Sequence, residues 1–218
     1  MNNSNNIFDY LHDEFDPESE EDYKLDFSEK GLTTVPKNIG ELKNTKITEL
    51  ILAANNLNSL PESIGDIKQL EVLNLGQNQF TKLPSSIGDL ENLKILLINN
   101  NHLESLPESI GNLSHLEELK LDNNPNLRSL PESIVRITGQ PLEISIMNTG
   151  ITILPNNLPD NITIIDDNYE EEEYGGASRK TKKNKKSKKT KKSKKKTRKS
   201  KKTKRSKKTR KTKKNRKY

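Results

Sequence analysis

The sequence contains no cysteine and no tryptophan, and its only histidines are His12, His102 and His115. The absence of cysteine excludes disulfides, thiolate metal sites and cysteine nucleophiles, and it fits an intracellular protein better than a secreted one. No apolar run approaches the roughly 18 residues that a membrane-spanning helix requires. The opening segment MNNSNNIFDYLHDEF lacks the basic region and the apolar core of a secretory signal. We therefore expect an intracellular protein that is not secreted.

Charge is divided between the two ends of the chain. All 31 acidic residues precede residue 179, whereas 27 of the 38 Lys and Arg residues follow residue 178. The first part therefore carries 31 negative and 11 positive side chains, a balance of −20, and the second part carries +27. The formal net charge of +7 is the difference between two unlike segments and describes neither of them.

An internal repeat organises the acidic part. A Leu-Pro pair recurs at nearly equal intervals, beginning at Leu60, Leu83, Leu106, Leu130 and Leu154. Each repeat contains a short period-2 segment, at residues 50–52, 73–75, 96–98, 119–121 and 144–146, which predicts a strand with one buried face. The segment Pro-x-x-Ile-Gly-x-Leu spaces its apolar residues by three, which predicts a short helical or 3₁₀ turn. One such unit cannot bury its apolar edge alone, so the units are expected to stack into a solenoid.

The combined pattern L-x-L-x-x-N-x-L and L-P-x-x-I-G-x-L resembles the leucine-rich repeat family, in its cytoplasmic type with a repeat of about 23 residues. The resemblance covers residues 23–168 and implies an α/β solenoid, a horseshoe with a parallel sheet of short strands on its concave side and short helical or 3₁₀ segments on its convex side. In that family the repeat asparagine is buried and bonds backbone groups of adjacent turns. The resemblance gives this structural role to Asn55, Asn78, Asn101 and Asn124.

The chain is expected to contain four segments. Residues 1–22 form either an acidic leader or an N-terminal cap, since Ile7, Leu11 and Phe15 recur on one helical face. Residues 23–168 form the solenoid, and residues 169–178 form an acidic, glycine-containing hinge. Residues 179–218 form a polybasic tail. Because this tail has dense like charge and almost no apolar residues, we expect it to be disordered.

The concave face is the first candidate binding site. If the strand leucines point inward, the alternating residues lie on this face, with apolar residues near the middle and charged residues towards the ends. An apolar centre with a polar rim is typical of a protein interface. The predicted partner-binding residues are Glu49, Ile51, Val72, Asn74, Ile95, Leu97, Asn99, Glu118, Lys120 and Asp122.

The tail is the second candidate site, because polycations bind polyanions and release condensed counterions. The predicted polyanion-binding residues are Lys188, Lys189, Lys191, Lys192, Lys194, Lys195, Lys196, Arg198, Lys199, Lys201 and Lys202. Nothing in the tail presents a rigid element to a nucleic-acid groove, so binding would not depend on base sequence. A nuclear-import signal, binding to anionic lipid, and binding to the acidic half of the chain remain open alternatives. The tail also resembles those of proteins encoded by large nucleocytoplasmic DNA viruses.

The sequence contains no phosphate loop, no G-x-S-x-G elbow and no H-E-x-x-H motif, so we expect neither an enzyme nor a cofactor. His102 and His115 are expected to be solvated surface histidines. The favoured function is an adaptor that holds a protein on the concave face and is tethered to nucleic acid or another polyanion by the tail. Two alternatives are a nucleic-acid packaging protein with the solenoid as a soluble spacer, and a regulatory subunit for a signalling protein.

Overall fold

A computed structural model describes residues 24–167 of the chain. Tertiary contacts divide the chain into two units, Met1–Glu172 and Glu173–Tyr218, and the described residues all belong to the first. The expectations for the leader or cap at 1–22, the hinge at 169–178 and the basic tail at 179–218 lie outside the described residues.

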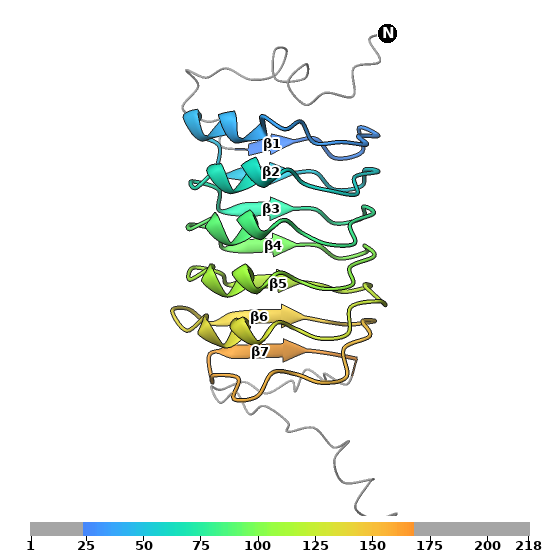
Figure 1. The fold of residues 1–218 in the computed structure, drawn as a ribbon, viewed down its shortest axis with the longest axis vertical. Helices are drawn as coiled ribbons and strands as arrows, with labels where there is room; N and C mark the ends of the chain where they lie inside the picture. The colour runs from blue at the N-terminus through green and yellow to red at the C-terminus, as the bar shows by residue number, and fades with distance from the viewer. Residues whose placement is uncertain (1–23, 168–218) are drawn as a thin grey trace, which may run out of the picture. The chain divides into compact units, whose positions relative to one another are not determined.

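The described residues form one open sheet of seven parallel strands, arranged in sequence order from β1 to β7 (Figure 1). The strands are β1 (Lys24–Asp26), β2 (Glu49–Ile51), β3 (Val72–Asn74), β4 (Ile95–Leu97), β5 (Glu118–Lys120), β6 (Leu142–Ser145) and β7 (Ile162–Ile165). The predicted solenoid is confirmed, although β2 to β5 each begin one residue before the predicted period-2 segment. Consecutive strands pair in register, with equivalent residues of successive repeats opposite one another, because each repeat carries the same sequence pattern.

A short 3₁₀ helix, here called a 3₁₀ turn, follows each of the first five strands on the opposite side of the coil (Figure 1). These turns are η1 (Ile39–Asn44), η2 (Glu62–Asp66), η3 (Ser85–Asp89), η4 (Glu108–Asn112) and η5 (Glu132–Arg136). From η2 to η5 a proline stands directly before the turn, where its carbonyl accepts the first backbone hydrogen bond, as in Ile64 N–H to Pro61 O at 3.1 Å. Between β6 and β7, where the structure describes every residue, no such helix forms.

The core lies between the strands and the 3₁₀ turns. The inward residue of each central strand is fully buried, and so is the isoleucine at the middle of each turn from η2 to η5. These columns consist of Leu50, Leu73, Leu96, Leu119 and Ile144 from the strands, and Ile64, Ile87, Ile110 and Ile134 from the turns. Each repeat thus covers the apolar edge of the one before it, which is the main stabilising contribution in a solenoid.

Glycine in the 3₁₀ turns permits the closest contact between repeats. A Cβ atom on Gly65 would lie 2.5 Å from the carbonyl oxygen of Ser86, and one on Gly88 would lie 2.3 Å from that of Ser109. The turns therefore stack with the glycine of one against the backbone of the next. In η5 the corresponding residue is Val135, and no 3₁₀ turn of the described chain follows it.

Candidate functional site

The buried asparagines fix the turns that follow strands β2 to β5. The Oδ1 atom of Asn78 accepts a hydrogen bond from Leu57 N–H at 3.0 Å, and its Nδ2 donates to the carbonyls of Leu52 and Leu75 at 2.9 and 3.1 Å. Asn55, Asn101 and Asn124 repeat this arrangement between their own pairs of turns. These side chains form hydrogen bonds with backbone groups that water cannot reach. A buried backbone group without a hydrogen bond would destabilise the fold.

Both ends of the asparagine series depart from the pattern. Lys30, at the position equivalent to asparagine in the first turn, is exposed. Thr149 occupies the position in the sixth turn, where its Oγ1 donates to the Ile146 carbonyl at 2.8 Å. A threonine thus replaces one of the several bonds that an asparagine makes.

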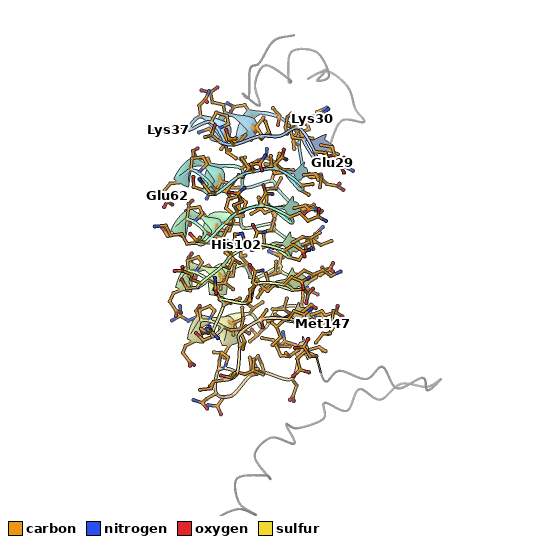
Figure 2. All side chains as sticks on the ribbon, turned by 90° about the vertical axis from the view of Figure 1, so that its right-hand side faces the viewer. Glu29, Lys30, Lys37, Glu62, His102 and Met147 are labelled. Atoms are coloured by element: carbon orange, nitrogen blue, oxygen red, sulfur yellow. The ribbon has the colours of Figure 1, made fainter. Side chains whose placement is uncertain are left out.

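Strand pairing arranges the predicted partner-binding residues in rows on the outer surface of the sheet, here called the strand face. The first row contains Glu49, Val72, Ile95, Glu118 and Glu143, and the second contains Ile51, Asn74, Leu97, Lys120 and Ser145. Asn99 and Asp122 follow in a third row, where the backbone N–H of Asn100 donates to the Asp122 carbonyl at 2.8 Å. Figure 2 shows the strands on the side of Glu29 and Met147, and the 3₁₀ turns on the side of Lys37 and Glu62.

The middle of the strand face is apolar. Val72 and Ile95 are direct neighbours in the first row, and Leu97 stands two residues beyond Ile95 on β4. Ile51 lies on β2, the strand that pairs with β3. All four side chains are half-buried. These four residues are the apolar centre of the strand face. Side chains on the pleated surface of a sheet shield one another only partly, so this centre keeps some apolar area exposed.

Charged side chains surround the apolar centre, and several of them already pair. Lys120 Nζ lies 2.7 Å from Glu118 Oε1, and the hydrogen bond to this carboxylate raises the pKa of Lys120. Lys94 Nζ lies 2.7 Å from Glu71 Oε2 beside the first row, and that hydrogen bond likewise raises the pKa of Lys94. Within residues 24–167, Glu49 and Glu143 form no ion pair.

Some polar groups in the second and third rows are held in fixed orientations. Asp122 Oδ1 accepts hydrogen bonds from Ser145 Oγ at 2.6 Å and from Met147 N–H at 2.8 Å. Asn74 Oδ1 accepts a hydrogen bond from Gly76 N–H at 3.0 Å. Part of the polar border of the apolar centre is therefore pre-formed, and fixed groups of this kind lower the entropic cost of association.

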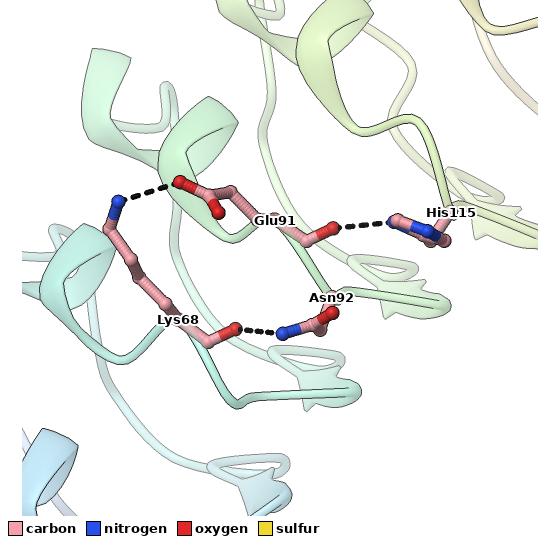
Figure 3. A network of polar contacts seen from close by, with 4 residues as sticks. All are labelled: Lys68, Glu91, Asn92 and His115. Atoms are coloured by element: carbon pink, nitrogen blue, oxygen red, sulfur yellow. Dashed lines mark hydrogen bonds and ion pairs between the residues drawn. The ribbon is translucent and has the colours of Figure 1, made fainter.

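Sequence reasoning missed a second series of side-chain bonds near the 3₁₀ side, in which Gln69, Asn92 and His115 contact carbonyls of the preceding turn. Asn92 Nδ2 donates to Lys68 O at 2.9 Å, and His115 Nδ1 lies 2.8 Å from Glu91 O (Figure 3). Because a carbonyl only accepts, Nδ1 is the protonated ring nitrogen. His115 is exposed as predicted, but it also joins two repeats. The detectable signal was a donor side chain at the same place in successive repeats.

An exposed ion pair lies in the same region. Lys68 Nζ lies 2.6 Å from Glu91 Oε1, and this hydrogen bond raises the pKa of Lys68 (Figure 3). Both side chains are more than half exposed, so the pair contributes little to stability. In the described segment, no group of three or more His, Asp or Glu residues is placed to hold a metal ion. Nor is any helix there long and apolar enough to cross a membrane.

A sequence profile described as a leucine-rich repeat region matches residues 36–128. Together with the stacked parallel strands, it defines the described chain as a leucine-rich-repeat solenoid. No curated protein matches the chain.

Several solved structures are similar to the chain. A leucine-rich repeat protein of Leptospira interrogans, LIC12759, is 30% identical with a TM-score of 0.55, and the match covers 74% of this chain and 45% of that one. The plant peptide hormone receptor RGFR1, solved in complex with RGF2, is 32% identical with a TM-score of 0.57 over 66% of this chain and 24% of the receptor. An internalin of Listeria monocytogenes, at 21% identity and a TM-score of 0.51, shares the fold over 64% of this chain and 39% of its own. The chain thus spans less than half the length of each of these structures.

Proposed function

We propose that the protein is a non-enzymatic adaptor that holds a protein partner on the strand face of its leucine-rich-repeat solenoid. The observation that carries this proposal is the half-buried apolar centre, Ile51, Val72, Ile95 and Leu97, with charged and amide side chains around it. A pre-formed polar border around an apolar middle is the usual composition of a protein interface. The similar plant peptide hormone receptor RGFR1, which was solved in complex with RGF2, adds support for a binding function.

The second part of the proposal concerns the basic tail at 179–218, which carries 27 Lys and Arg residues and no acidic residue. We propose that it tethers the adaptor, inside the cell, to nucleic acid or another polyanion without regard to base sequence. Affinity for duplex DNA should fall with salt at a log–log slope of about −0.9 per phosphate contact, so about eight contacts give a slope of roughly −7. Residues 1–178 alone should lack this binding.

Two matched double variants of the full chain test the partner site. Ile95→Lys/Leu97→Lys places two charges in the apolar centre, and Thr81→Lys/Ser85→Lys places the same charges at exposed positions away from the strands. Each protein is used to capture partners from its native source, and a thermal melt verifies that it is folded. The adaptor function predicts that only Ile95→Lys/Leu97→Lys loses its partner, while both variants keep the DNA affinity of the parent.

Equal capture by the two double variants would refute the strand face as the partner site. It would favour the packaging alternative, in which the solenoid is a soluble spacer and the tail alone is functional. If DNA binding by the full chain did not depend on salt, the proposed tether would be refuted. The proposed partner site would not be affected by that result.

A further inference from the structure

The strand face presents an ordered series of side-chain types, and we infer from it the kind of segment that it binds. From β1 to β6 the first row reads ammonium, carboxylate, apolar, apolar, carboxylate, carboxylate, formed by Lys24, Glu49, Val72, Ile95, Glu118 and Glu143. The inferred ligand is an extended peptide segment with apolar residues in its middle and a basic residue near each end, about six positions apart. This inference rests on the proposed function of the strand face.

The charges of the row select basic residues in the ligand. Glu118 is already paired with Lys120 at 2.7 Å, and Lys24, the neighbour of Glu49, is paired with Asp26. Glu49 and Glu143 have no ion-pair partner among the described residues, although Lys120 attracts Glu143 at longer range. A neutral or acidic partner that covered these two carboxylates would remove water from them without replacing its interactions. A cation beside each carboxylate compensates for that loss.

The spacing of the two carboxylates sets the spacing in the ligand. Glu49 is on β2 and Glu143 is on β6, so four strand-to-strand steps of about 4.8 Å separate them by roughly 19 Å. An extended peptide advances about 3.3 Å per residue, so about six residues span this distance. The apolar pair Val72 and Ile95 lies between the two carboxylates, which places the apolar residues of the ligand between its basic ones.

Two amide side chains favour an extended backbone over other apolar ligands. Asn74 Nδ2 and the side-chain amide of Asn99 make no hydrogen bond with a described residue, so they are available to the N–H and C=O groups of a peptide. Gly76 allows the amides to lie close together, because a Cβ there would be 2.9 Å from Asn99 Oδ1 and 3.2 Å from Asn74 Oδ1.

Two other occupants fit the face less well. A second copy of the chain would bring a row with three carboxylates and one ammonium group against an identical row, and its excess of like charge opposes association. The chain's own tail has the required charge, but from residue 179 onward it has no apolar side chain before Tyr218. It would satisfy the carboxylates and leave the apolar centre uncovered.

The test uses fluorescence polarisation of labelled synthetic peptides with the full chain. RGISLGR has two arginines six positions apart, QGISLGQ replaces them with neutral residues, and RRGISLG keeps both charges at one end. Glutamine is used because an acidic peptide would bind the tail. We expect RGISLGR to bind about three- to tenfold more tightly than either of the others, as two exposed ion pairs would provide.

Matched variants locate the effect. Glu49→Gln/Glu143→Gln should abolish the preference for RGISLGR, whereas Glu41→Gln/Glu132→Gln removes two exposed carboxylates from the 3₁₀ turns and should preserve it. A preference that persists in Glu49→Gln/Glu143→Gln, equal binding of the three peptides, or no binding of RGISLGR by the parent would each overturn the inference. The proposed function is decided separately, by whether Ile95→Lys/Leu97→Lys loses its natural partner.

Discussion

Replacing Gly88 with alanine tests how closely consecutive repeats stack. The added Cβ would lie 2.3 Å from the carbonyl oxygen of Ser109, 2.6 Å from its Cβ and 2.8 Å from its carbonyl carbon. Ordinary contacts of a Cβ atom begin at 3.4 Å, so η3 and η4 would have to separate by about 1 Å. Two of the three contacts are with backbone atoms, and no change of side-chain rotamer relieves them.

The expected magnitude follows from two opposing effects. Overpacking of a well-packed interior costs typically about 1–3 kcal/mol. Alanine also restricts the unfolded chain relative to glycine, which stabilises the folded state by about 0.4–1 kcal/mol. The net expectation for Gly88→Ala is a loss of about 1–2 kcal/mol in the free energy of unfolding, or roughly 2–8 °C in the melting temperature of a solenoid of this size.

Urea unfolding of the full chain, followed by far-ultraviolet circular dichroism, measures this loss. Ser85→Ala, at the exposed first position of η3, is the control and should stay within about 0.5 kcal/mol of the parent. Adding Ser109→Gly to Gly88→Ala should restore only part of the stability, because the Ser109 carbonyl remains in place. A Gly88→Ala protein as stable as the parent would refute the close stacking of the turns.

The remaining predictions use the same unfolding assay. Asn101→Ala leaves Phe80 N–H without its partner and removes one hydrogen bond from each of the carbonyls of Leu75 and Ile98, which keep a bond from Asn78 or Asn124. It should cost about 2–3 kcal/mol, whereas exposed Asn100→Ala should not approach that loss. Ala54 has φ of 55°, in the left-handed region, so Ala54→Gly should stabilise the protein by about 0.5–1 kcal/mol, and a loss would contradict this account. Hydrogen bonding from Ser28 lowers the pKa of Asp26 below its ordinary 3.8, so its stabilising contribution is present above that value and is lost as the pH falls through the lowered pKa. Asp26→Asn should therefore be less stable than the parent at pH 7, with the difference vanishing in strong acid; a difference that is independent of pH would exclude this linkage.

The repeat itself made the rows of the strand face predictable. In a stacked solenoid, residues one repeat apart become neighbours, so Val72 and Ile95 had to lie side by side once the strands were in register. The in-and-out alternation of Leu96 and Leu97 followed from the period of a strand. The same logic placed Asn78 and Asn101 in equivalent turns.

Contacts with the backbone of another repeat were harder to predict from the sequence. The sequence indicated a short helical turn at η3, but not that Gly88 lies against the backbone of Ser109, because stacking distances depend on how both turns pack on the core. His115 likewise looked like an isolated surface residue, since its partner is a backbone carbonyl in another repeat. The recurrence of a donor side chain at residues 69, 92 and 115 was the detectable signal, whereas the backbone carbonyls that accept these bonds have none in the sequence.

The amino-acid sequence by itself determined the class of fold, the order of the strands and the side chains that share a face, because all three follow from the periodicity. Only the tertiary structure decided which charges pair. Glu71 and Glu117 each lie one repeat away from Lys94, on opposite sides, so the repeat alone does not distinguish them. In the structure Lys94 Nζ bonds Glu71 Oε2 at 2.7 Å, while Glu117 contributes only a longer-range attraction. That choice depends on the rotamers of the three side chains. Atoms that neighbour them in space determine these rotamers, and sequence spacing does not.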